Sequence, residues 1–162
     1  MNSDKEIFRE PDLSTRPLNL TVERLMNLKS ETLFNAWTSE FDVWFAVPGS
    51  VLMTGKVNTP FFFETEFRPD KNSEIQRHPH YGRFLRIVSN QLIELTWLTG
   101  TEGTKGSETI VTVELISQDN KTLLKLAHSG FPDEESKNRH QQAWPMVLEQ
   151  LEKRYLENKV SH

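Results

Sequence analysis

Two histidines separated by a single proline, His78-Pro79-His80, are the first residues of this chain whose spacing could support chemistry. Neighbouring histidines can bind a metal ion, but structural zinc sites need four protein ligands, and cysteine is common among them. The chain has no cysteine, and the proline between the two histidines stiffens the backbone. We therefore expect no metal site here.

Patterns for a nucleophile or for phosphate binding are also absent from the sequence. Ser129-Gly130 lacks the Gly-x-Ser-x-Gly turn in which many hydrolases present a serine nucleophile. The glycines at 100, 103 and 106 do not follow a strand into a helix, and no Gly-Lys-Ser/Thr run accompanies them. We expect no cofactor and identify no catalytic residue, so nothing in the sequence supports catalysis directly, and whether the chain is an enzyme stays open.

Two polar residues fall on the otherwise apolar side of predicted strands. His128 shares its side with two leucines and can therefore face the interior. A neutral histidine there can bond a ligand hydroxyl or carbonyl, or it can be satisfied by a backbone carbonyl or a neighbouring side chain. Arg24 could meet a ligand carboxylate, but a lone buried charge is so unfavourable that we favour pairing with a glutamate: Glu64, Glu66 or Glu94.

The charged segment 133–139 leads into the last predicted helix. It mixes both signs of charge, which is typical of a solvated helix face. A docking surface for a protein partner is the alternative interpretation. His140 follows directly on this segment, and we expect it to face solvent.

The composition narrows the class of protein. The chain has 162 residues, close to one ordinary domain that can bury a core of its own. Its net charge of -4 argues against binding of nucleic acid, which needs clustered lysine and arginine. No run approaches the roughly 20 apolar residues of a membrane helix, so we expect no membrane insertion. The absence of cysteine fits a cytoplasmic location.

Hydrophobic periodicity predicts the elements that must position these residues. Residues 1–17 carry only isolated apolar side chains and two prolines, which indicates a mobile or loosely docked extension before a domain at 18–159. Alternation of apolar and polar residues from Leu18 predicts a first strand. Helical spacing then predicts two short helices, with Ser30 and Ser39 as their N-caps.

Six further strands and one long helix are predicted next. The polar residues 68–79 are expected to form a loop. Asp133 can cap a last helix that bends or restarts at Pro145 and carries an apolar stripe. Strands in a regular series, with no helix between them, imply antiparallel pairing, so the fold class is α+β. The predicted strands cover 51–57, 61–67, 81–88, 92–99, 109–116 and 122–128.

Several short runs of residues resemble one known family. At the start of the domain they are Arg24, Ala36-Trp37-Thr38 and Trp44-Phe45. Further along they are Tyr81-Gly82, Thr96-Trp97, and the run Leu126-Ala127-His128-Ser129-Gly130-Phe131-Pro132 followed by Trp144. Over roughly Leu18 to Leu156, the chain resembles the domains related to the C-terminal part of the activator of Hsp90 ATPase. That family belongs to the START-like, helix-grip (SRPBCC) superfamily of ligand-binding domains.

The resemblance implies a helix-grip fold. A curved seven-stranded antiparallel sheet would wrap around the C-terminal helix, with two short helices after the first strand and an interior cavity for an apolar molecule. The alternative is that the inward side chains pack against one another as an ordinary core. Strand alternation and the superfamily analogy together place these residues around the cavity: Phe63, Phe67, Trp97, Val111, Val113, Leu126, His128, Phe131, Trp144, Val147, Leu148 and Leu151.

We therefore predict that the chain binds a small hydrophobic molecule without catalysis. A lipid, a polyketide-like compound or a flavonoid-like compound would suit such a cavity. Two other functions remain open. The domain could be an interaction module that modulates a chaperone or another protein partner, or it could be an enzyme of the polyketide cyclase or aromatase type.

Overall fold

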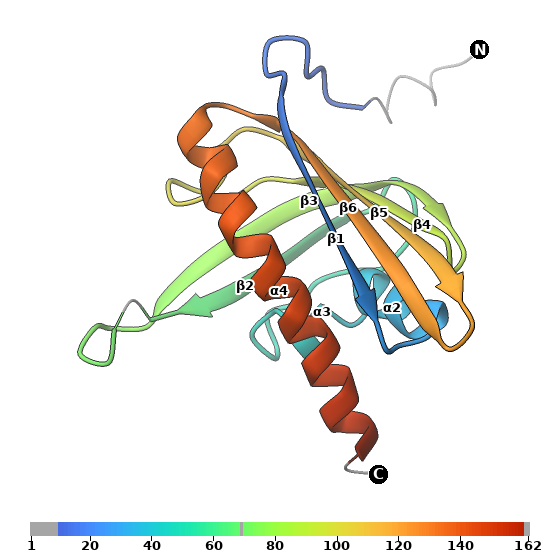
Figure 1. Ribbon diagram of the computed structural model, residues 1–162. Helices are drawn as coiled ribbons and strands as arrows, with labels where there is room; N and C mark the ends of the chain where they lie inside the picture. The colour runs from blue at the N-terminus through green and yellow to red at the C-terminus, as the bar shows by residue number, and fades with distance from the viewer. Residues whose placement is uncertain (1–9, 69, 161–162) are drawn as a thin grey trace.

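The computed structural model describes residues 10–68 and 70–160, which form a curved antiparallel sheet of six strands crossed by a long helix (Figure 1). This confirms the predicted α+β class and helix-grip arrangement. The strand order is β1-β6-β5-β4-β3-β2. The strands are β1 (Leu18–Met26), β2 (Pro60–Phe67), β3 (Gln76–Val88), β4 (Leu92–Trp97), β5 (Thr109–Gln118) and β6 (Lys121–Phe131). The helices are α2 (Ser30–Thr38), α3 (Phe41–Trp44) and α4 (Glu134–Val160).

The seventh strand, predicted at 51–57, does not form among the described residues. Only Leu52 pairs with the sheet, through an isolated bridge to Phe62 of β2. The backbone then leaves the extended conformation, because Gly55 has φ 69° and Asn58 has φ 68°. Residues with positive φ cannot continue a β ladder, so this segment turns back toward the start of β2.

Strand β3 begins five residues earlier than predicted, because it continues through Pro79. The register pairs Pro79 with Glu64 of β2. On its other side this half of β3 has little pairing, since the β4 ladder covers only Phe84–Val88, with one further bridge from Tyr81 to Leu98. A strand with a free side tolerates a residue that has no N–H to donate. The early half of β3 therefore forms, with β2, an arm that projects beyond α4 (Figure 1).

Aromatic rings fill the space between α4, the short helices and the sheet. The ring centroids of Trp97 and Trp144 lie 5.5 Å apart, and those of Trp144 and Trp37 lie 6.1 Å apart. Phe41 of α3 stacks on Phe63 of β2 at 4.7 Å. These five rings are at most 3% exposed. Their burial, at about 25 cal/mol per Å² of apolar surface, is a large part of what holds the helices to the sheet.

The predicted serine caps are wrong. Helix α2 follows Lys29, and neither Lys29 nor Glu40, the residue before α3, makes a side-chain cap bond. Ser39 is instead the C-cap of α2, where its backbone N–H donates to the backbone oxygen of Asn35. The hydroxyl of Ser30 is buried instead and lies 2.6 Å from Ser117 Oγ and 3.1 Å from Thr122 Oγ1. A buried hydroxyl is satisfied by the nearest partner, which here joins the start of α2 to the β5–β6 hairpin.

The C-terminal half of α4 is fixed to β1 by a partly buried ion pair. Arg24 Nε and Nη2 donate to Glu152 Oε1 at 3.0 and 2.9 Å, and the backbone N–H of Asn27 donates to Glu152 Oε2 at 2.7 Å. The glutamates predicted to pair with Arg24 do not do so, because strand alternation turns their side chains to the outer face of the sheet: Glu64, Glu66 and Glu94.

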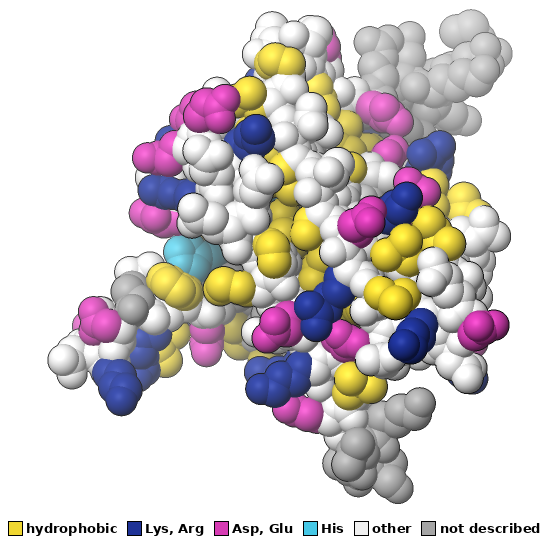
Figure 2. All heavy atoms as spheres, viewed as in Figure 1, with side chains coloured by type: hydrophobic (Ala, Val, Ile, Leu, Met, Phe, Trp, Pro, Cys, Tyr) yellow, Lys and Arg dark blue, Asp and Glu magenta, His cyan; other side chains and the backbone are white. Residues whose placement is uncertain are grey.

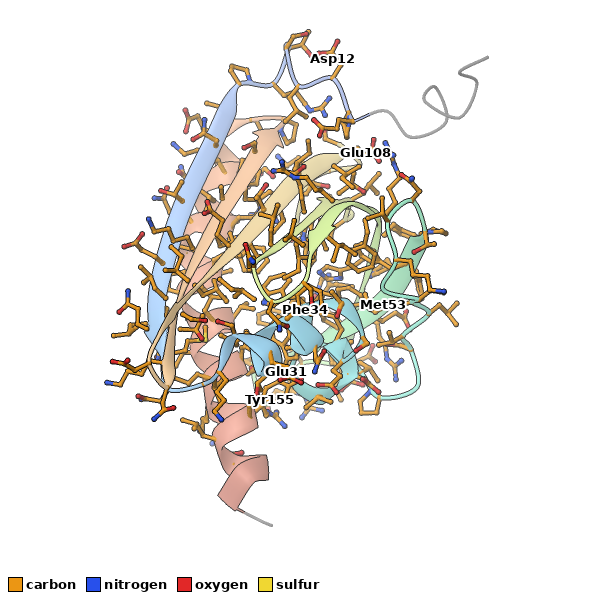
Figure 3. The ribbon with its side chains drawn as sticks, turned by 90° about the vertical axis from the view of Figure 1, so that its right-hand side faces the viewer. Asp12, Glu31, Phe34, Met53, Glu108 and Tyr155 are labelled. Atoms are coloured by element: carbon orange, nitrogen blue, oxygen red, sulfur yellow. The ribbon has the colours of Figure 1, made fainter. Side chains whose placement is uncertain are left out.

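Two further bonds hold this half of α4 to the short helices. Tyr155 Oη donates to Glu40 Oε1 at 2.7 Å, and Gln150 Nε2 donates to the backbone oxygen of Trp44 at 2.6 Å. Figure 3 shows the molecule turned by 90° from Figure 1, with Tyr155 of α4 and Glu31 of α2 labelled in its lower half. The segment 150–155 of α4 is thus attached to β1, α3 and the α2–α3 connection.

The described part of the predicted N-terminal extension, 10–17, contacts the sheet. Residues 1–9 of that extension lie outside the described part of the chain. Arg16 Nε donates to the backbone oxygen of Gly130 at 2.8 Å, and Arg16 Nη2 donates to that of Glu108 at 2.6 Å. Leu13 packs over Gly130, and a Cβ atom on Gly130 would clash with the Leu13 side chain. The segment therefore meets the start of β5 and the end of β6.

A test of the packing concerns Gly82 of β3, where a Cβ would overlap the Phe61 ring and the Thr96 carbonyl. We expect Gly82→Ala to lower the free energy of unfolding by about 1–3 kcal/mol, because ring and strand must shift. Thermal unfolding followed by circular dichroism should show a melting temperature lower by several degrees. Gly100→Ala is the matched control, since no atom lies within 4 Å of its Cβ position. Identical melting of Gly82→Ala and the wild type would contradict this account of the sheet.

Candidate functional site

A half-open cavity of about 580 Å³ lies between the N-terminal half of α4 and the arm of β2 and β3. Figure 2 shows this side of the molecule, with a histidine among hydrophobic side chains at the junction of arm and body. The volume is within the range of pockets that hold small organic molecules. The lining residues are Phe45, Thr65, Phe67, Gln76, His78, Pro79, His80, Trp97, Thr99, Gly100, Thr101, Glu102, Gly103, His140, Ala143, Trp144 and Val147.

The loop between β4 and β5 forms one rim of this pocket and is held by buried hydrogen bonds. The N–H groups of Thr99 and Thr104 each donate to the other residue's hydroxyl oxygen, at 2.9 and 2.8 Å. Ser136 Oγ of α4 donates to the backbone oxygen of Gly103 at 2.6 Å. As predicted, Asp133 caps α4, accepting from the Ser136 N–H at 2.8 Å. The rim and the start of α4 therefore form one connected unit.

Ion pairs on the surface join the same loop to α4. Lys105 Nζ lies 2.9 Å from Asp133 Oδ2 and 2.7 Å from Glu135 Oε1, and Arg139 Nη1 lies 3.3 Å from Glu102 Oε2. The Lys105 ammonium lowers the pKa of the Glu135 carboxyl. The charged face predicted for 133–139 is thus exposed, and it also pairs with the pocket rim. Pairs of this kind are screened by salt and stabilise weakly.

His128 belongs to a buried chain of hydrogen bonds between α4 and the sheet. Trp144 Nε1, which can only donate, lies 3.0 Å from His128 Nδ1. His128 Nε2 therefore carries the ring hydrogen and donates to Thr109 Oγ1 at 2.7 Å, while the Thr109 hydroxyl donates to the backbone oxygen of Trp97. Burial is the main cause that holds the pKa of His128 well below its usual value, and the charge of the nearby His140 is the second. His128 is thus satisfied by neighbouring side chains, the second of the two interpretations left open above.

His80 of β3 faces inward and lines the pocket. It is 8% exposed, and its ring stacks on Phe63 with centroids 4.8 Å apart. Nδ1 lies 2.9 Å from the backbone oxygen of His78. Burial lowers the pKa of His80 to about 4, against the opposing effect of that hydrogen bond. The ring is therefore neutral at pH 7.

His140 is not solvent-facing, so that prediction is wrong. Its ring lies edge-on to His128, with centroids 4.9 Å apart, and close to the Phe131 ring at 5.0 Å. Nδ1 lies 2.8 Å from the backbone oxygen of Ser136, one turn earlier in α4. Burial lowers the pKa of His140 as well. His140 lies one turn before Trp144 and on the same side of α4. Because Trp144 faces inward to bond with His128, His140 faces the pocket as well.

The predicted cavity residues divide into two groups. Four of them line the pocket: Phe67, Trp97, Trp144 and Val147. The others are at most 1% exposed and lie in the core, away from the pocket wall: Phe63, Val111, Val113, Leu126, His128, Phe131, Leu148 and Leu151. Aromatic rings fill the centre between sheet and helix, and this pocket lies at the end where the arm diverges from α4.

Sequence reasoning missed His80, His140, Phe45 and the rim loop as pocket residues. The signal for His80 was present, because it shares strand parity with Gly82 and Phe84 once the strand is extended through Pro79. The expectation of a loop at 68–79 hid that parity. Among the described residues, no group of three or more His, Cys, Asp or Glu is arranged to hold a metal ion. None of the described helices has the length and apolar character needed to span a membrane.

Comparison with known proteins agrees with this architecture. Residues 27–156 match the family described as Activator of Hsp90 ATPase homolog 1-like protein. The chain belongs to this family. Curated proteins, by contrast, include no match to the sequence.

Solved structures of other proteins share this fold. A Chromobacterium violaceum protein is 21% identical, with a TM-score of 0.68 over 84% of this chain and 96% of the other. An Hsp90 activator from Plasmodium falciparum is 25% identical, with a TM-score of 0.54 over 71% of this chain and 74% of the other. A dimeric Aha1 from Colwellia psychrerythraea is 14% identical, with a TM-score of 0.57 over 83% and 93%.

The buried histidines make a testable prediction about pH. Because His80 has a pKa of about 4 when folded and about 6.5 when unfolded, the unfolded chain binds more protons between these values. Stability is therefore full above pH 6.5 and falls as the pH drops toward 4. His80→Phe removes this contribution, so between pH 7.5 and 5 the variant should lose about 2 kcal/mol less than the wild type in urea unfolding. Parallel stability curves for the two proteins would show that His80 is not buried as a neutral ring.

Proposed function

We propose that this protein binds a small, largely apolar aromatic molecule in the pocket between α4 and the β2–β3 arm. The observation that carries the proposal is the half-open cavity of about 580 Å³ with rings on its walls. Phe45 and Trp97 lie nearly parallel, 6.2 Å apart, and Trp144 lies 5.5 Å from Trp97. Rings in such positions can pack against the faces and edges of an aromatic ligand.

Burial of the ligand would supply the binding free energy. Apolar surface removed from water contributes about 25 cal/mol per Å², from which the loss of translational and rotational freedom must be subtracted. The rim loop is already held against α4 by the hydrogen bond from Ser136 Oγ to the backbone oxygen of Gly103. A pre-formed pocket loses little conformational freedom when it is filled.

The electrostatics of the pocket favour binding over acid–base catalysis. A general base works best when its pKa lies near the operating pH. Burial shifts the pKa of His80 to about 4 and lowers that of His140 too, so both are weak bases at neutral pH. The two nitrogens of His128 are occupied by Trp144 and Thr109. These properties support a non-catalytic role.

The proposal can be tested by filling the pocket from α4. Val147 lines it, whereas the preceding residue, Met146, is 71% exposed and does not. We expect Val147→Trp to weaken binding of 2-naphthol, used as a probe in two-dimensional NMR titration, by about tenfold or more. Met146→Trp introduces the same side chain outside the pocket and should bind like the wild type. Equal binding by both variants, or no binding by the wild type, would contradict the proposal.

A second candidate function is modulation of a chaperone. It is favoured by the family description and by the fold shared with the Plasmodium falciparum structure titled an Hsp90 activator. If the chain acts in this way, adding it to purified Hsp90 should raise the rate of ATP hydrolysis, and Val147→Trp should leave that effect unchanged because the pocket is not involved. An ATPase rate unaffected by the wild-type protein would remove this candidate.

A further inference from the structure

The hydrogen bonds of His80 fix which ring nitrogen carries its hydrogen. The backbone oxygen of His78 can only accept, so Nδ1 of His80, 2.9 Å away, must donate. In a neutral ring the other nitrogen, Nε2, is then an acceptor. The described residues make no hydrogen bond to that nitrogen. His80 is more than nine-tenths buried and lines the pocket.

His140 repeats this arrangement from the opposite wall. Its Nδ1 lies 2.8 Å from the backbone oxygen of Ser136 and must likewise donate. Its Nε2 is then an acceptor, and the described residues provide no hydrogen-bond donor for it. The ring is close enough to His80 for the charge of one to lower the pKa of the other. Strand β3 and helix α4 therefore each contribute to the pocket lining one histidine whose Nε2 is an acceptor.

The other polar groups on the wall make a negatively charged ligand unfavourable. The described residues that line the pocket include no lysine or arginine. Their one carboxylate, that of Glu102, pairs with Arg139 outside the pocket. A ligand carboxylate would therefore meet histidine lone pairs and lose its hydration without gaining a cation.

From this geometry we infer that the natural ligand is a neutral aromatic compound that carries hydroxyl or N–H donors, which His80 Nε2 and His140 Nε2 accept. The inference rests on the proposed function and adds the chemical class of the ligand. A donor on the ligand can bond to such a ring nitrogen, whereas an ether oxygen in the same place faces it with another lone pair. Sites built to bond a ligand hydroxyl discriminate strongly against analogues that lack it.

Three probes with one ring system test the inference: 2-naphthol, 2-methoxynaphthalene and 2-naphthoate. The wild-type protein at pH 7.5 should bind 2-naphthol about tenfold more tightly than either of the others, by NMR titration. The hydroxyl compound can donate, the methyl ether can only accept, and the carboxylate is an anion. Equal affinity for the hydroxyl and ether probes would overturn the inference while leaving the proposed function intact.

The double variant His80→Phe/His140→Phe supplies the control. It keeps a ring at each position and removes both acceptors, so it should bind 2-methoxynaphthalene at least as well as the wild type does. Its preference for 2-naphthol should shrink to about twofold or less. A preference that persists in this variant would overturn the assignment to the two histidines. Failure of the wild type to bind any of the three probes would contradict the proposed function, and the inference with it.

Discussion

The chain of buried hydrogen bonds from Trp144 through His128 and Thr109 to Trp97 determines where α4 lies on the sheet. Each member donates a hydrogen bond to the next. A buried donor or acceptor left without its partner would lower the free energy of unfolding by about 1–3 kcal/mol. A rotation of α4 by one residue would move the Trp144 N–H away from His128. These hydrogen bonds therefore select one placement of α4 among many that would bury a similar apolar area. Val147 lines the pocket as a consequence.

The pocket follows from how the two halves of α4 are attached. Its C-terminal half is bound to β1 through Glu152 and Arg24, while its N-terminal half is bound to the rim loop through Ser136 and Gly103. The β2–β3 arm is attached to neither and diverges from the helix (Figure 1). Space remains where arm and helix separate, and it is lined by rings that elsewhere fill the core. The same burial that stabilises the fold keeps His80 and His140 neutral.

Strand positions could be predicted from the sequence because each strand has one buried and one exposed face. Alternation located the buried sides of β4, β5 and β6 correctly, as the burial of Leu95, Val113 and Leu126 shows. The seventh strand was predicted wrongly because the alternation gave no sign of the positive φ angles at Gly55 and Asn58. Whether such a segment forms a strand depends on its backbone φ and ψ angles, and the pattern of hydrophobic residues alone does not reveal these angles.

The site was less predictable than the fold, for a physical reason. Apolar residues that form a core and those that line a pocket share one periodicity, so Phe63 and Phe67 look alike in sequence although only Phe67 reaches the pocket. Which of them meets open space depends on the divergence of the arm, a tertiary property. The partner of Arg24 was mistaken for a similar reason, since Glu152 lies 128 residues away in the chain and only the crossing of α4 brings the two together.

The most direct test of the central claim is a set of intermolecular nuclear Overhauser effects between bound 2-naphthol and the isotope-labelled protein. Contacts from the probe to the Val147 methyl groups and to the Trp97 and Trp144 rings would place an aromatic ligand in the pocket, as the account predicts. Contacts confined to exposed apolar residues outside it, such as Leu25 and Ile116, would contradict the account.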